Sequence, residues 1–287
     1  MAPDRQNKVH YVDTGRREEI IGEKSASTMK VLVISDIHAN LAALETVLKD
    51  AQSRGYDEIW CLGDVVGYGP DPNGCIERLA ALEPQLTVRL AGNHDYAVLG
   101  KEINVEDFNP EAKKAVLWTR EQLTTETRAY LDALSGEAVR RGEFMLVHGS
   151  PRDSVWEYVL SPRIARENFE ELTDFRCCLV GHTHVPTMFS YRVDRRDGQP
   201  FGRCLQHRLT PSPPDFALAF DQARLIINPG SVGQPRDHDP RASYALLDTE
   251  TRLWTYVRVE YPIEETQHRM LAAGLPERLI NRLSFGW

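Results

Sequence analysis

Short polar clusters built from Asp, Asn and His recur along the first two thirds of the chain, each directly after an apolar run. In chain order they contain Asp36 and His38, Asp64, Asn93, His94 and Asp95, His148, and His182 and His184. Imidazole nitrogen together with carboxylate and amide oxygen suits a borderline transition metal such as Mn, Fe, Co or Zn, whereas Ca²⁺ prefers an all-oxygen set. These side chains are too many for one tetrahedral ion, so we expect two ions that share a carboxylate.

Each cluster has a commoner explanation when it is taken alone. An Asp-x-His after a strand is usually a helix cap followed by a surface histidine, and Gly-Asp or Gly-Asn-His-Asp is an ordinary turn composition. A lone histidine such as His148 is usually a buried ring with satisfied hydrogen bonds, and a His-x-His pair is evenly balanced between the two explanations. The metal prediction therefore depends on five such clusters following strand-like segments in one chain.

The elements expected around these clusters alternate between strand and helix from Lys30 onward. Strand-like segments are KVLVIS, EIWCLGD, LTVRLAGN, FMLVHG and CCLVGHT, and helices are predicted at LAALETVLKDAQSRG, PNGCIERLAALE, about 110–134 and PRIARENFEEL. This alternation predicts β-α-β units and a largely parallel sheet, whose carboxyl edge binds ligands. Residues two apart on extended backbone point the same way, so Asp36 with His38, and His182 with His184, are expected to form two-pronged clamps.

The alternation of strands and helices stops after Pro186. The following residues contain short strand-like segments with little helix between them, such as TMFSYRV, RLIINPGS and WTYVRVEY. This predicts a second, more antiparallel sheet packed on the first within one domain, residues 29–287. The polar stretch 192–215 is rich in Pro, Gly and charge and is predicted to be an exposed hairpin tip or a loop over a sheet edge. Residues 1–28 are polar and of mixed charge, and we predict an extension outside the core.

The composition excludes several classes of protein. The 287 residues carry a net charge of −8, so no extended nucleic-acid surface is expected. No apolar run approaches the roughly 20 residues that span a bilayer, and the first residues lack the apolar region of a signal peptide, so no membrane association is expected. The five cysteines are odd in number and lack C-x-x-C spacing, which predicts free thiols, most of them buried, in a reducing, cytoplasmic compartment.

Taken together, SDIHAN, LGDVVGYGPDP, AGNHD, VHGSP and GHTHVP resemble the motifs of the calcineurin-like metallophosphoesterase superfamily, most closely its small bacterial and archaeal phosphodiesterase branch. The resemblance covers residues 29–248. It implies an α/β fold in four layers, α-β-β-α, with two mixed sheets flanked by helices, and a dinuclear metal centre. It also implies that one metal binds Asp36, His38, Asp64 and His184, and the other Asp64, Asn93, His148 and His182, with Asp64 bridging.

The GNHD motif contributes a further candidate. His94 resembles the family's histidine that is not a ligand but contacts the phosphate or protonates the leaving oxygen, and Asp95 either orients its ring or serves the turn. The protein-phosphatase branch continues its second motif as Gly-Asp-x-x-Asp-Arg-Gly, whereas residues 63–69 here read GDVVGYG. Without that Asp and Arg, a phosphoprotein substrate is disfavoured.

The predicted function is dinuclear-metal-dependent hydrolysis of a small phosphate ester or nucleotide, as a phosphodiesterase or phosphatase. In this mechanism a metal-bound hydroxide attacks phosphorus and His94 is the general acid. Two divalent or trivalent transition-metal ions are expected, Mn or Fe foremost and Zn or Co as alternatives. Alternative functions are a dinucleoside polyphosphate pyrophosphatase and a non-catalytic scaffold of the same fold. The oligomeric state is left open.

Three residues are candidates for substrate contact. Tyr68 either stacks on a base or packs against its own loop. Arg236 and Arg241 belong to the loop NPGSVGQPRDHDPRASY, which could approach the site but whose Gly, Pro and Asp residues are equally explained by turns.

Overall fold

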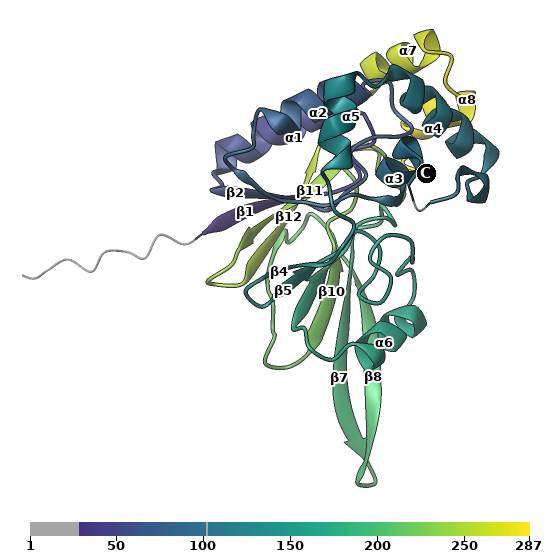
Figure 1. Ribbon diagram of the computed structural model, residues 1–287. Coiled ribbons are helices and arrows are strands. Elements are labelled where there is room, and N and C mark those ends of the chain that lie inside the picture. Colours follow the sequence, from purple (N-terminus) through teal and green to yellow (C-terminus); the bar gives the residue numbers. More distant parts are fainter. Residues whose placement is uncertain (1–28, 102) are drawn as a thin grey trace, which may run out of the picture.

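Two six-stranded sheets packed face to face form the centre of the computed structural model, and helices cover their outer faces (Figure 1). The structure describes residues 29–101 and 103–287. The predicted extension at residues 1–28 lies outside the described residues.

The first sheet combines parallel and antiparallel pairing, in the order β3-β2-β1-β11-β12-β9. The first three strands along the chain are parallel to one another, and the remaining three join them antiparallel. Its strands are β1 (Lys30–Ile34), β2 (Glu58–Cys61), β3 (Leu86–Arg89), β9 (Asp215–Ala217), β11 (Ala242–Asp248) and β12 (Leu253–Val259).

The second sheet has the order β4-β5-β6-β10-β7-β8 and is also mixed. Strands β5, β6 and β10 are parallel in its middle, with antiparallel strands on both sides. Its strands are β4 (Val139–Arg141), β5 (Phe144–Leu146), β6 (Cys177–Leu179), β7 (Thr187–Arg196), β8 (Gln199–Arg208) and β10 (Arg224–Asn228).

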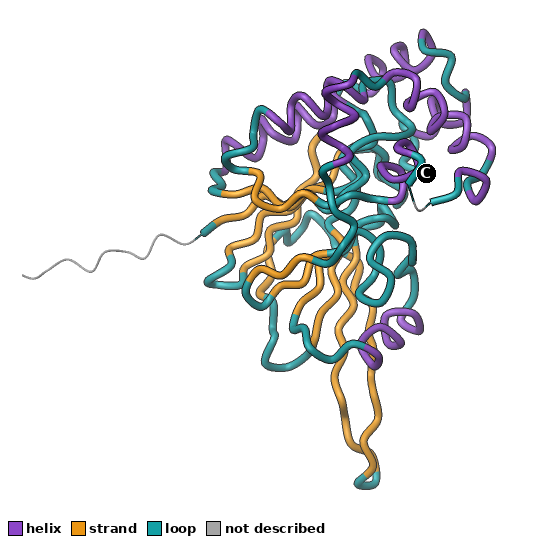
Figure 2. Tube along the Cα trace, in the orientation of Figure 1, coloured by secondary structure: helices purple, strands orange, loops and turns teal. Residues whose placement is uncertain are grey.

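Helices gather mainly on the outer side of the first sheet, while α6 lies against the outer side of the second (Figures 1 and 2). They are α1 (Leu41–Arg54), α2 (Pro72–Ala80), α3 (Asn93–Leu99), the 3₁₀ turn η1 (Val105–Asp107), α4 (Pro110–Gln122), α5 (Thr125–Asp132), α6 (Pro162–Glu171), α7 (Ile263–Ala272) and α8 (Glu277–Arg282). The predicted four-layer α-β-β-α fold is confirmed.

Alternation along β1 explains why the layers form. Val31 and Val33 belong to the apolar cluster between the sheets, whereas Leu32 and Ile34 pack against the helices. Since successive side chains of a strand point to opposite faces, an uninterrupted apolar run buries both faces of its sheet. The next helix also begins as predicted, because the side chain of Asn40 accepts a hydrogen bond from the backbone N–H of Ala43.

The expected division of the chain between the sheets is wrong. The sequence predicts one largely parallel sheet from the residues before Pro186 and a second, more antiparallel sheet from the residues after it. Instead β6 lies in the second sheet between β5 and β10 and pairs with both, while β11 and β12 belong to the first sheet. The physical reason is that the sequence of an apolar strand does not specify which strand it pairs with. For example, β1 pairs with parallel β2 on one side and with antiparallel β11 on the other.

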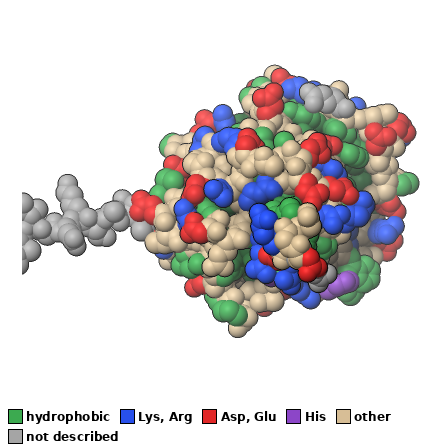
Figure 3. Space-filling view, turned by 90° about the horizontal axis from the view of Figure 1, so that it is seen from below, with side chains coloured by type: hydrophobic (Ala, Val, Ile, Leu, Met, Phe, Trp, Pro, Cys, Tyr) green, Lys and Arg blue, Asp and Glu red, His purple; other side chains and the backbone are tan. Residues whose placement is uncertain are grey.

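The polar stretch 192–215 is a hairpin rather than a loop over an edge. Strands β7 and β8 pair over ten residue pairs, from Thr187 with Arg208 to Arg196 with Gln199, and project from the body (Figure 2). Its polarity is explained by the position of β8 at the end of the sheet, where solvent covers one side. Basic and acidic side chains are interspersed on the face seen from this end (Figure 3).

All five cysteines are free, as predicted, and four of them are buried. Cys204 on β8 is only partly buried. Among the described helices, none combines the length and the apolar character needed to cross a bilayer.

Candidate metal centre

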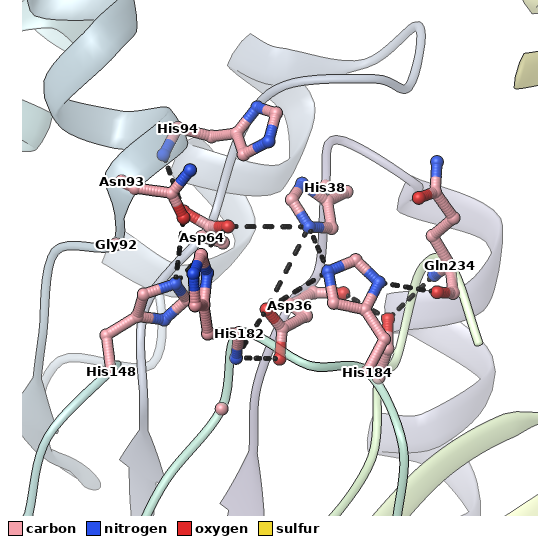
Figure 4. Close-up of polar contacts among 12 residues, drawn as sticks. Asp36, His38, Asp64, Gly92, Asn93, His94, His148, His182, His184 and Gln234 are labelled. Carbon is pink, nitrogen blue, oxygen red and sulfur yellow. Dashed lines mark hydrogen bonds and ion pairs between the residues drawn. The ribbon is translucent and has the colours of Figure 1, made fainter. Parts of the chain in front are cut away.

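The polar clusters of the sequence meet at one place, where the carboxyl ends of strands from both sheets face each other (Figure 4). The first two clusters follow β1 and β2, and the GNHD cluster begins α3. The last two follow β5 and β6 of the other sheet. All of the predicted ligands are at most 3 % exposed, namely Asp36, His38, Asp64, Asn93, His148, His182 and His184.

One group of side chains combines residues from both sheets. Asp36, His38, Asp64 and His184 place ligand atoms within 4.8 Å of one another. His184 Nε2 is 3.4 Å from Asp36 Oδ1, and His38 Nε2 is 3.5 Å from Asp64 Oδ2. These four residues are the set that the sequence resemblance implied for one metal.

A second group shares Asp64 with the first. Asp64, His148 and His182 also lie within 4.8 Å of one another by their ligand atoms. Asn93 extends this group, because its Oδ1 is 3.2 Å from His148 Nε2. The resemblance implied these four residues for the other metal.

Asp64 stands between the two groups. Its Oδ1 accepts a hydrogen bond from the backbone N–H of His94 at 2.8 Å. Its Oδ2 is buried and has no hydrogen-bond partner among the described residues, although His38 Nε2 and His148 Nε2 lie 3.5 and 3.4 Å away. A buried carboxylate oxygen without a partner is costly, and a cation on each side would satisfy it.

Each of the four histidines keeps one ring nitrogen in a hydrogen bond to a backbone carbonyl. Because a carbonyl oxygen only accepts, that nitrogen carries the proton, and the other nitrogen of a neutral ring presents a lone pair to the cluster. No sequence pattern indicates these carbonyl partners. The bonds join His38 Nδ1 to Val66 O (3.1 Å), His148 Nδ1 to Leu62 O (2.9 Å), His182 Nε2 to Trp156 O (2.9 Å) and His184 Nδ1 to Gln234 O (2.6 Å).

In the first group, the ring nitrogens that face the cluster are the clearest indication of a cation site. His38 Nε2 and His184 Nε2 are 3.0 Å apart, and both rings donate from Nδ1. Two lone pairs at that distance repel each other unless a positive charge lies against both. The donor set of imidazole, carboxylate and amide fits a transition metal.

The electrostatics of the cluster favour metal binding. Burial lowers the pKa of His38, His182 and His184 well below the usual value, so these rings stay in the neutral form that binds metals. Burial alone would also lower the pKa of His148, but the negative charge of Asp64 raises it to about 9. The charge of Asp64 thus favours a proton on His148, and a cation bound beside Asp64 would compete with that proton.

The backbone at these residues differs from the expected extended clamps. Five of the predicted ligands have positive φ, a conformation that costs of order 1–3 kcal/mol per residue and that clusters at functional sites. The extended clamps expected from strand parity are therefore wrong: tight turns orient these side chains, and His182 and His184 belong to different groups. The residues are Asp36 (53°), His38 (49°), Asp64 (51°), His182 (65°) and His184 (57°).

Gly92 allows the GNHD segment to reach the centre. A Cβ atom placed on Gly92 would lie 2.1 Å from Asp64 Oδ1 and 2.5 Å from the backbone nitrogen of Asp64. Any larger residue would displace the carboxylate that both groups share.

Asp95 does not orient the ring of His94. Its carboxylate accepts hydrogen bonds from the backbone N–H groups of Val65 (3.2 Å), Val66 (3.0 Å) and Gly92 (3.0 Å). It therefore ties the loop after β2 to the start of α3, and the predicted catalytic role gives way to a structural one. Burial, followed by the charge of Asp64, raises the pKa of Asp95.

Replacing Asp95 by Ala is expected to destabilise the protein by about 3 kcal/mol or more. Three buried amide groups would lose their acceptor, and each unsatisfied group costs about 1–3 kcal/mol. Urea unfolding measures the change. The matched control is Thr124→Ala, which removes the side-chain cap of α5 and should cost about 1 kcal/mol. A stable Asp95→Ala variant with slowed turnover would instead restore the role beside His94.

His94 lies beside the centre without joining either group. Its ring is 4.9 Å from that of His38 and 4.3 Å from that of Tyr68, measured between centroids. Its Nδ1 is buried and has no hydrogen-bond partner among the described residues. A Cβ atom on Gly67 would come within 2.5 Å of that nitrogen, so only glycine keeps this space free. Burial lowers the pKa of His94 to about 4.

The three candidates for substrate contact differ in their distance from the metal centre and in their partners. Tyr68 is buried against His38 and His94, and the guanidinium of Arg236 lies over its ring at 5.6 Å. Arg241 is directed elsewhere, since its guanidinium pairs with Asp239 at 2.6 Å. Sequence reasoning missed Tyr158, whose ring stacks on His182 at 3.6 Å. A tyrosine in a loop gives no sequence signal of this kind.

The fold and the paired Asp/His groups define a metallohydrolase. A sequence profile of the calcineurin-like phosphoesterase superfamily domain matches residues 29–252, and the chain belongs to this family. It is therefore a hydrolase of phosphate esters, and the family depends on a dinuclear metal centre.

Several individual proteins are similar to this chain over most of its length. A metallophosphoesterase from Sphaerobacter thermophilus has a similar structure, with a TM-score of 0.74 and 42 % identity over 91 % of this chain and 100 % of that chain. The uncharacterized protein MJ0912 of Methanocaldococcus jannaschii is 36 % identical over 89 % of this chain and 98 % of its own. Phosphodiesterase YfcE of Escherichia coli K12 is 25 % identical over 77 % of this chain and 89 % of its own.

Proposed function

We propose that this protein hydrolyses small phosphate esters with two transition-metal ions at the described cluster. A phosphoprotein is the less favoured substrate. One ion would be held by Asp36, His38, Asp64 and His184. The other would be held by Asp64, Asn93, His148 and His182.

The observation that carries the proposal is the position of Asp64 Oδ2. This oxygen is buried, lacks a hydrogen-bond partner among the described residues, and lies about equally far from His38 Nε2 (3.5 Å) and His148 Nε2 (3.4 Å). A carboxylate placed between two sets of nitrogen ligands suits a bridge between two cations.

The bound ions would supply the activation of water and the neutralisation of the phosphate charge. The protein itself holds the ligands rigid: the four carbonyl bonds fix the imidazole tautomers. His94 would contact the phosphate or hand a proton to the leaving oxygen. Because burial lowers the pKa of His94 to about 4, it can hold a proton at neutral pH only when the negative charge of the substrate stabilises the imidazolium.

The identity of the metals belongs to the proposal as well. Mn or Fe fits the mixed nitrogen and oxygen donors best, with Zn or Co as alternatives, because no cysteine is among the proposed ligands. The free cysteines support a reducing, cytoplasmic compartment for the protein.

A metal-dependence experiment tests the function. The purified protein is stripped with a chelator, reloaded with Mn²⁺, Fe²⁺, Zn²⁺ or Co²⁺, and assayed on a bis-aryl phosphate diester and an aryl phosphate monoester. We expect two ions per chain by elemental analysis and restored hydrolysis of at least one of the two esters with at least one metal. A protein that retains two ions but hydrolyses neither ester would contradict the proposal. A chain that binds no metal and hydrolyses neither ester would favour the alternative, a non-catalytic scaffold of the same fold.

A further inference from the structure

A cavity of about 670 Å³ lies beside the metal centre. Tyr68 and Tyr158 line it, and their rings also contact His38 and His182 respectively, one from each group of proposed ligands. The opposite wall comes from the C-terminal part of the chain, with residues of α8 and Trp287. We call this cavity the α8 pocket.

Two arginines give the α8 pocket a positive charge. Arg236 and Arg282 both line it and are both partly buried. Among the described residues, no side-chain carboxylate lies within 4.0 Å of either guanidinium. Arg236 instead donates to Gln234 Oε1 from Nη2 at 2.9 Å and from Nε at 3.3 Å, and it also interacts with the hydroxyl groups of Tyr68 and Tyr158. Arg282 donates from Nε to the main-chain oxygen of Trp287. The two guanidiniums therefore have donors left for an anion.

The acidic residues of the pocket do not cancel this charge. Glu111 is 3.8 Å from Arg278, so these two lining residues offset each other. Glu277 is exposed to solvent, which screens its charge. Burial, followed by the charge of Arg236, lowers the pKa of Arg282 to about 10, as expected for two cations that share one pocket.

The pocket also offers aromatic surface. Trp287 is 54 % exposed and stacks on Phe285 with centroids 4.6 Å apart. Tyr158 is 38 % exposed. Exposed aromatic rings next to guanidiniums without a carboxylate side chain as partner are a combination that suits nucleotides, since bases stack on such rings while phosphates pair with arginine.

This wall is held in place by the fold. The backbone N–H of His238 donates to the carbonyl of Gly286 at 2.8 Å, which ties the end of the chain to the loop that carries Arg236. On the other side, Leu279 and Leu283 pack in one cluster with Ala112 of α4.

We propose that the α8 pocket binds the part of the substrate beyond the scissile phosphate, and that this part carries a second phosphate and an aromatic base. Arg236 and Arg282 contact the second phosphate, and Trp287 stacks on the base. The substrate class is thus a nucleoside di- or polyphosphate ester. This inference names the substrate class of the proposed function, and it rests on that function only in placing the scissile phosphate at the metal centre.

The experiment compares two substrates in the metal-loaded enzyme: a bis-aryl phosphate diester, which has one phosphate, and a dinucleoside tetraphosphate. In Arg282→Gln we expect KM for the tetraphosphate to rise about tenfold or more, because a charge-assisted hydrogen bond is lost. KM for the bis-aryl diester should change less than about threefold. Trp287→Ala, at an exposed position that the core does not need, should raise KM for the tetraphosphate about fivefold or more.

Arg163→Gln is the matched control, since it removes an equally charged side chain that is 72 % exposed on α6. It should leave both KM values unchanged. An equal change for both substrates in Arg282→Gln and Trp287→Ala, or no change for either, would overturn the α8 pocket while leaving the hydrolase intact. If the wild-type enzyme hydrolyses no phosphate ester, the proposed function fails. In that case, ADP binding measured by calorimetry in the wild type and in Arg282→Gln tests the α8 pocket alone. Tenfold weaker ADP binding by Arg282→Gln would support the proposed phosphate contact, and equal binding would overturn it.

Discussion

Replacing Asp64 by Asn is expected to lower the hydrolysis rate by about 10³-fold or more and the metal content from two ions per chain to fewer than one. Losing a residue that merely orients a ligand typically costs 10–100-fold, so losing a carboxylate that serves both ions should cost more. Asparagine has nearly the same shape and can still accept the hydrogen bond from the backbone N–H of His94. The change therefore removes charge from Oδ2 with little disturbance of the fold.

Elemental analysis and thermal melting separate this effect from misfolding. In the wild type, added Mn²⁺ should raise the melting temperature, because a ligand that binds only the folded state stabilises it. In Asp64→Asn that rise should disappear, while the metal-free melting temperature stays close to the wild-type value or above it. Asp132→Asn is the control, since Asp132 is 60 % exposed and pairs with Lys101 on the surface. Two ions per chain in purified Asp64→Asn would show that the carboxylate is not a bridge.

Replacing His94 by Ala is expected to lower kcat by about 10²–10⁴-fold while the protein keeps both metal ions. His94 is not within either group of ligand atoms, although its ring lies 4.9 Å from that of His38. Its role depends on whether it supplies a proton or only contacts the phosphate. An alkoxide needs a proton to leave, whereas an activated aryl oxide departs readily without one.

A comparison of leaving groups distinguishes the two roles. If His94 is the general acid, His94→Ala should lose far more activity on a dinucleoside monophosphate, with an alkoxide leaving group, than on a bis-aryl diester. Equal losses on both substrates would assign His94 to contact with the phosphate. A parallel loss of metal content would contradict both roles and make His94 a ligand. The conservative variant His94→Gln, which can donate a hydrogen bond but cannot act as an acid, should recover activity only in the second case.

The candidate ligands could be brought together from the sequence because each polar cluster follows an apolar segment. An apolar strand such as VLVI buries both faces, and the first polar residue after it must lie at the end of the sheet. With several parallel strands, those ends meet at one edge. Local pattern and the order of the segments are therefore enough to place Asp36, Asp64 and His148 in one candidate site.

Backbone geometry at the site could not be predicted in the same way. The clamps expected from strand parity are tight turns with positive φ, for example at Asp36 and His184. Such conformations are unfavourable locally and persist only because surrounding contacts hold them, such as the hydrogen bonds from the backbone N–H of His182 to both oxygens of Asp36. A sequence window contains no information about contacts made across 146 residues.

The sequence by itself determined the order of strands and helices, the ends of the first helix, and the types of side chain that gather at the strand ends. Tertiary structure alone decided the distribution of strands between the sheets, the carbonyl partners of the histidines, the structural role of Asp95 and the wall formed by Arg282 and Trp287. The physical reason is range. Helix caps and apolar alternation act between near neighbours in the chain, whereas sheet partners, backbone acceptors and pocket walls come from segments that meet only when the whole chain has folded.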